Sequence, residues 1–112
     1  MRRTIAISMT FWLVILVLGC ASERARLLAA TDAYATTLEV LADARRAGLI
    51  DDRQAAEIER WRVVARAALD AWRLAVETGQ PPEGAIQRFN EAMRALTDAA
   101  LEAKRRRERE NE

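Results

Sequence analysis

Apolar residues recur at spacings of three and four through three long segments of this 112-residue chain. Residues three and four apart share one side of an α-helix, so each segment predicts a helix with one apolar face. The segments are separated by Gly48 and by the run Gly79-Gln80-Pro81-Pro82, whose residue types end helices. Alanine, leucine, arginine and glutamate are abundant and strand formers are few. The predicted fold class is all-α.

Local signals give the helix limits, which we place at about 22–47, 52–78 and 83–108. Gly48 suits the left-handed position that ends a helix, after which Leu49 or Ile50 can pack back over the last turn. Asp51 and Gln54 have the spacing of a capping box at the start of the second helix. Proline fits the first turn of the third helix.

The three apolar faces are similar in length and therefore predict one shared core. Short turns between amphipathic helices favour a small antiparallel bundle, or a hairpin with an extra arm. The expected core positions are Leu27, Thr31, Tyr34, Leu38 and Leu41 in the first helix, Ile58, Trp61, Ala65, Ala68, Trp72 and Ala75, flanked by Val64, Leu69 and Val76, in the second, and Ile86, Phe89, Met93, Leu96, Ala100 and Ala103 in the third.

The N-terminus has the arrangement of a signal peptide. Arg2 and Arg3 form a basic start, and a mostly apolar stretch follows up to Gly19. This stretch is shorter than the roughly 20 apolar residues that a membrane-spanning helix needs. We therefore expect residues 1–19 to be a signal peptide and residues 20–112 to be the helical domain.

The end of this leader, Val17-Leu18-Gly19-Cys20, resembles the lipobox of bacterial lipoproteins, although Leu18 stands where a smaller residue is more usual. The resemblance implies that the Cys20 thiol receives a diacylglyceryl group and that a signal peptidase cuts between Gly19 and Cys20. It also implies a lipid-anchored protein that faces the periplasm. In the lipoprotein family an aspartate after the cysteine favours retention in the inner membrane, so Ala21 at this position implies the inner leaflet of the outer membrane as the destination in a Gram-negative cell. An uncleaved N-terminal anchor and a cytoplasmic protein with an apolar N-terminus are the alternatives.

Composition excludes several kinds of catalytic and metal site. The chain has no histidine and a single cysteine, so an internal disulfide, a Cys/His zinc site and a catalytic Ser-His-Asp or Cys-His set are excluded. We expect no enzyme activity, cofactor or metal, because helix capping and surface solvation explain the carboxylate pairs Asp51 with Asp52 and Glu57 with Glu59. Basic and acidic residues number 18 and 17, a balance that argues against nucleic-acid binding.

Trp61 and Trp72 are the candidate partner-binding residues. They are three helical turns apart and share one side of the second helix. They are interpreted either as core residues or as aromatic anchors for a partner helix or a glycan. The basic run that begins at Lys104 has a similar pair of interpretations, as a solvated helix end or as a binding site for anionic lipid.

Two classes of function stay open for a lipid-anchored helical protein. The first is a non-catalytic envelope interaction or scaffold protein, with a protein partner or a second copy of itself. The second is a phage- or prophage-encoded envelope effector, either a lysis subunit or a superinfection-exclusion protein. The body is loosely similar to small alanine-rich helical lipoproteins of bacteria and prophages, in composition and helix layout alone.

Overall fold

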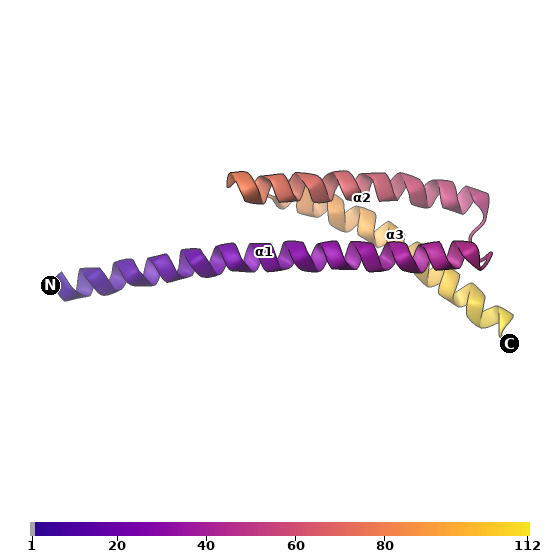
Figure 1. Ribbon diagram of the computed structural model, residues 1–112, viewed down its shortest axis with the longest axis horizontal. Helices are drawn as coiled ribbons and strands as arrows, with labels where there is room; N and C mark the ends of the chain where they lie inside the picture. The colour runs from indigo at the N-terminus through magenta and orange to yellow at the C-terminus, as the bar shows by residue number, and fades with distance from the viewer. Residues whose placement is uncertain (1) are drawn as a thin grey trace.

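The computed structural model describes the backbone of residues 2–112 and the side chains of residues 22–112. It contains three helices, α1 (Arg2–Arg46), α2 (Asp52–Thr78) and α3 (Glu83–Glu110), as Figure 1 shows. The all-α prediction is confirmed, and α2 has the limits that the sequence indicated. The α1 helix begins before residue 22, where we expected it to start, because no proline separates the leader from the body.

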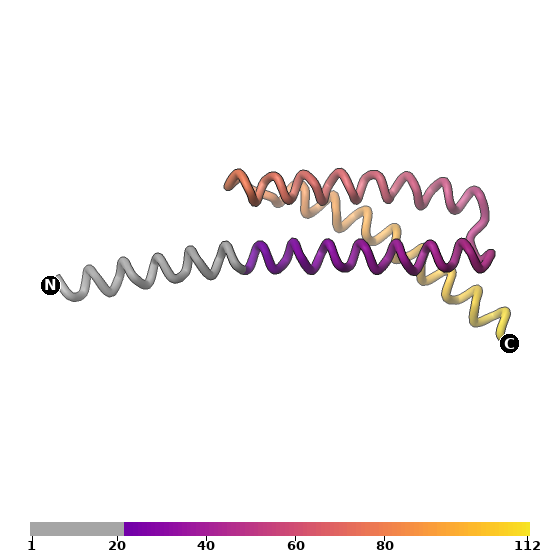
Figure 2. Tube along the Cα trace, viewed as in Figure 1, coloured from indigo at the N-terminus to yellow at the C-terminus, as the bar shows by residue number. Residues whose placement is uncertain are grey.

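The predicted cleavage site between Gly19 and Cys20 lies outside the residues whose side chains are described, and so does the predicted lipid attachment point on Cys20. Figure 2 shows the limit of the described region as the change from grey to colour. Within that region, no helix is both long and apolar enough to cross a membrane.

The helices alternate in direction and form a small bundle (Figure 1). Glu23 and Arg26 of α1 lie beside Pro82 and Glu83 at the start of α3. We call this the proximal end. At the opposite, distal end, the C-terminal part of α3 lies against the turn between α1 and α2. The α1 and α3 helices therefore run in the same direction, and α2 runs antiparallel to both.

The core is built around aromatic side chains from all three helices. The Phe89 ring lies 5.9 Å from Trp72 in an edge-on contact and 6.5 Å from Tyr34, measured between ring centroids. Small residues let the helices approach each other, and the packed core extends from this cluster to the distal turn. The other buried apolar residues are Leu41, Ala44, Leu49, Ile50, Ala65, Ala68, Leu69, Ala85, Ala92, Leu96 and Ala103.

The expected apolar faces therefore form the core, but not every expected position is covered. Val64 is exposed, and the expected positions that are only partly buried are Leu27, Thr31, Leu38, Ile58, Trp61, Ala75, Val76, Ile86, Met93 and Ala100. Ile58 and Trp61 lie in the N-terminal half of α2, where α1 and α3 do not cover the full width of its apolar face. The consequence is an open groove, described below.

Both connections end their preceding helix with a glycine in the left-handed conformation. Gly48 has a φ of 76° and Gly79 a φ of 70°. After α1, the amide of Gly48 donates to the carbonyl of Arg45 at 3.1 Å, and the amide of Leu49 donates to the carbonyl of Ala44 at 3.0 Å. This is the Schellman arrangement, and it directs Leu49 and Ile50 back into the core.

Gly48→Ala and Gly84→Ala are expected to change stability in opposite directions. A Cβ atom at either position would meet no other atom within 4 Å, so the effect comes from the backbone alone. At Gly48 a left-handed alanine costs about 1 to 2 kcal/mol, whereas at Gly84, inside α3, alanine should stabilise by about 0.5 kcal/mol. Denaturant unfolding of both variants measures the difference. Equal effects would contradict the structure of the α1–α2 turn.

Candidate functional site

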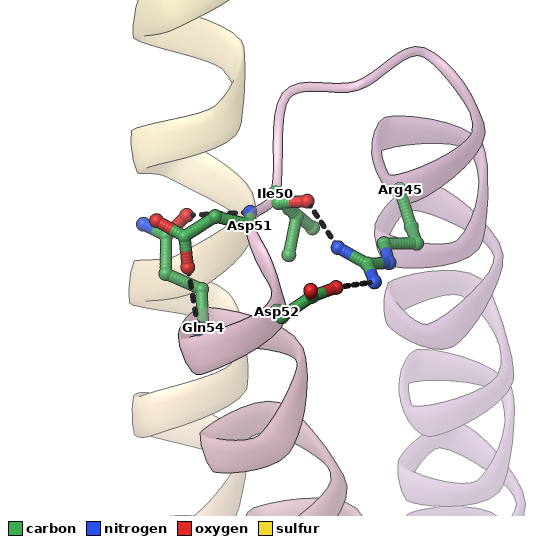
Figure 3. Close-up of polar contacts among 5 residues, drawn as sticks. All are labelled: Arg45, Ile50, Asp51, Asp52 and Gln54. Atoms are coloured by element: carbon green, nitrogen blue, oxygen red, sulfur yellow. Dashed lines mark hydrogen bonds and ion pairs between the residues drawn. The ribbon is translucent and has the colours of Figure 1, made fainter.

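The α1–α2 turn at the distal end is held by polar contacts from both helices that it joins (Figure 3). The Arg45 guanidinium donates to the carbonyl of Ile50 at 2.6 Å and forms an ion pair with Asp52. The amide of Gln54 donates to the Asp51 carboxylate at 2.8 Å, and the Asp51 amide donates to the Gln54 side chain at 3.1 Å. The predicted capping box is confirmed. Asp51 and Asp52 have separate structural partners.

Arg106 ties α3 to this turn, a role that sequence reasoning missed. Its Nη1 atom donates to the carbonyl of Leu49 at 3.0 Å and to the Oε1 atom of Gln54 at 2.8 Å. Its Nε atom lies 3.6 Å from the Glu102 carboxylate. One arginine of the C-terminal basic run is therefore a structural residue, while its neighbours Lys104, Arg105 and Arg107 are exposed.

A groove of about 410 Å³ lies between α2 and α3, directly beside the turn. Its walls are Ile58 and Trp61 from α2, opposite Ala95 and Ala99 from α3. The short alanine side chains leave the space that a larger residue would fill. Leu49, Ile50, Leu96 and Ala103 also line it, together with the polar residues Gln54, Glu57, Asp98 and Glu102.

The two tryptophans of α2 have different surroundings. Trp72 is 4% exposed and packs edge-on against Phe89, as the core interpretation predicts. Trp61 lines the groove and is only partly buried, and the guanidinium carbon of Arg60 lies 5.6 Å from its ring centroid. A large aromatic side chain at the edge of an apolar hollow is typical of binding surfaces. Of the two candidate partner-binding residues, Trp61 is the accessible one.

The two carboxylates of the other pair considered in the sequence, Glu57 and Glu59, also have different surroundings. Glu57 lies at the groove, whereas Glu59 accepts hydrogen bonds from Arg62 at 2.7 and 2.5 Å. The hydrogen bond from Arg62 lowers the pKa of Glu59. The pKa of Arg62 is raised by the hydrogen bond to Glu59 and, to a smaller degree, by Tyr34 of α1. Arg62 therefore stays charged and remains paired with Glu59 on the surface of α2.

A second hollow, of about 510 Å³, lies between α1 and α3 near the distal end. Val40 and Leu101 line it and are about half exposed. Charged residues of both signs surround them, including Asp43, Lys104 and Arg107. Among the side chains that the structure describes, no three cysteine or carboxylate residues gather closely enough to hold a metal ion.

Comparison with known proteins identifies no relative from which a site could be transferred. No family model matches the chain, and no curated protein or solved structure is significantly similar to it.

Proposed function

We propose that this protein is a non-catalytic lipoprotein of the bacterial envelope, in which acylated Cys20 anchors a helical interaction or scaffold domain on the periplasmic side of a membrane. The observation that carries the proposal is the sequence Val17-Leu18-Gly19-Cys20 after a basic start and an apolar stretch. The Cys20 thiol is the one cysteine thiol of the chain. Lipid attachment needs no side chain other than this cysteine, so it is compatible with a chain that has no histidine and no second cysteine.

Lipid on Cys20 is sufficient, in physical terms, to keep the domain at a membrane. Each buried methylene group contributes about 0.8 kcal/mol, so two or three acyl chains make attachment effectively permanent, whereas one chain gives marginal binding. The anchor would join α1 two residues before the part of this helix whose side chains are described, at the proximal end. Since α2 is 27 residues long, the groove beside Trp61 lies several helical turns away from this attachment point.

The groove is the surface through which we propose that the domain binds a protein partner. It combines an accessible tryptophan with apolar walls and a rim of carboxylates, and the distal turn beside it is held by several hydrogen bonds. A preorganised apolar surface of this kind binds without the cost of ordering its own backbone. A scaffold or interaction function requires only such a surface and an anchor.

The anchor is tested by growing cells that express the full chain with labelled palmitate. The wild type is expected to incorporate label and to lose residues 1–19, and Cys20→Ser is expected to abolish both events. Leu18→Ala is the matched control, because it changes the same motif toward the family pattern and should preserve labelling. A wild-type protein that is neither labelled nor cleaved would refute the lipoprotein proposal.

A further inference from the structure

The α1–α2 turn receives a hydrogen bond from a helix that is distant in the sequence. The carbonyl of Ile50 accepts from Arg45 of α1, five residues earlier. The carbonyl of Leu49 accepts instead from Arg106 of α3, 57 residues further along the chain. The side chains of both turn residues are buried in the core. Two consecutive carbonyls of the turn are therefore held by arginines of two different helices.

The side chain of Gln54 connects this contact to the start of α2. Its Oε1 atom accepts from the Asp51 amide at 3.1 Å, which completes the capping box (Figure 3). The same oxygen accepts from Nη1 of Arg106 at 2.8 Å. Each contact restricts the rotamer of Gln54, so the formation of one lowers the entropic cost of the other. One oxygen atom thus serves the first turn of α2 and the C-terminal turns of α3 together.

Arg106 also contacts three of the residues that line the groove between α2 and α3. These residues are Leu49, Gln54 and Glu102. The guanidinium donates to the first two and lies 3.6 Å from the carboxylate of the third. Gln54 belongs to α2 and Glu102 to α3. The contacts of a single side chain therefore join the two walls of the groove at its distal end.

We propose that Arg106 is the positioning residue of this groove, because it couples the C-terminal turns of α3 to the first turn of α2, so that the two segments order or fray as one unit. The relevance of this unit to partner binding rests on the proposed function of the groove, whereas the coupling itself does not. A binding surface whose walls are fixed in advance avoids the cost of ordering them when the partner binds. Partner affinity then depends on a residue that need not touch the partner.

A planar guanidinium with several donors suits this position. Nη1 of Arg106 donates to two acceptors while Nε faces the Glu102 carboxylate. A lysine ammonium is a compact charge on one nitrogen and lacks this fork of donors, so it cannot replace both sets of contacts. The adjacent Arg107 is the matched control. It is exposed and lines the hollow between α1 and α3, on another side of α3.

Hydrogen exchange at the first turn of α2 tests the coupling in the full-length protein. Arg106→Ala is expected to speed exchange of the Asp51, Gln54 and Ala55 amides by about tenfold, because it removes a hydrogen bond from a charged donor to Gln54. Arg106→Lys retains the charge and should not restore protection. Arg107→Ala removes the same charge from α3 and should leave these amides unchanged. Faster exchange that is confined to α3, or an equal effect of Arg107→Ala, would overturn the proposal.

A double variant distinguishes coupling from two independent losses. Gln54→Ala and Arg106→Ala should each expose the first turn of α2, and the two together should expose it no more than the more damaging single substitution does. Exchange is compared with that of the Trp72 amide, in the core part of α2, which reports any general loss of stability. Effects that add in the double variant would show that the two residues act separately and would contradict the coupling.

Thiol labelling inside the groove tests the positioning role. Ala99→Cys places a thiol on the α3 wall, and a bulky maleimide should react with it several-fold faster when Arg106→Ala is added, because the walls are no longer tied together. Ala67→Cys, on an exposed part of α2, should react equally in both backgrounds. Unchanged labelling of Ala99→Cys would overturn the positioning role. Strong labelling of the wild type would reveal a free Cys20 thiol and count against the lipid anchor, while the comparison of the two cysteine variants would still decide the role of Arg106.

Discussion

Trp72→Ala is expected to destabilise the bundle by about 3 to 5 kcal/mol, which is the usual cost of removing a large aromatic side chain from a core. Trp72 is almost fully buried and packs against Phe89, which in turn contacts Tyr34. Its removal leaves a cavity where the three helices meet. Since small domains are stable by about 5 to 15 kcal/mol in total, this loss should unfold a large fraction of the protein at moderate denaturant concentration.

Trp61→Ala is the matched control for this prediction. It removes the same side chain from the same helix, but at a position that lines the open groove. Its expected cost is about 1 to 2 kcal/mol, because solvent can enter the space that the ring leaves. Unfolding in denaturant, followed by far-ultraviolet circular dichroism of the full chain, measures both. Equal losses would contradict the different environments of the two rings.

The contrast between Trp61 and Trp72 also shows where sequence patterns stop being informative. Spacing correctly places both residues on one side of α2, because helical periodicity is a local property. What covers each residue depends on its opposite neighbour in another helix. Phe89 covers Trp72, whereas Ala95 and Ala99 leave Trp61 accessible. The small residues of the third segment were visible in the sequence, but their register against α2 was not.

The end of α1 and the limits of α2 were predictable for a related reason. Gly48, Asp51 and Gly79 act through contacts with residues close by in the chain, so their effect can be recognised without knowing the tertiary structure. The link from Arg106 to Leu49 joins residues far apart in the sequence and had no local signal. The Arg-rich run at the end of α3 looked uniform, and only its packing against the turn distinguishes one arginine from its neighbours.

The exposed apolar residues of α2 were not considered because the core analysis used only one face of this helix. Val63 and Leu74 were outside the stripe that aligned Ile58, Trp61 and Ala65, and they received no interpretation. Their exposure became a question only when the opposite side of α2 was found to be buried.

Leu96→Ala is expected to cost about 2 to 5 kcal/mol, and Leu101→Ala on the same helix less than about 1 kcal/mol. Leu96 is 0% exposed, whereas Leu101 is 47% exposed. Thermal or denaturant unfolding of the two variants tests the assignment of inner and outer faces on α3. If Leu101→Ala were as costly as Leu96→Ala, Leu101 would have to be buried, either by a different helix register or by a partner.

The position of Leu96 beside the groove places the expected cost of Leu96→Ala at the lower end of this range of about 2 to 5 kcal/mol. It forms part of the lining of the groove beside Trp61, so truncation enlarges a space that already opens to solvent. A sealed cavity retains the full penalty of an empty volume, while an open one can admit water or collapse inward. We therefore expect Leu96→Ala to lower the free energy of unfolding by about 2 to 3 kcal/mol. This value is close to the transfer free energy of the removed methyl groups alone, without the added cost of an empty cavity. A small apolar solute that fills the enlarged groove should recover part of this stability, by preferential binding to the folded state.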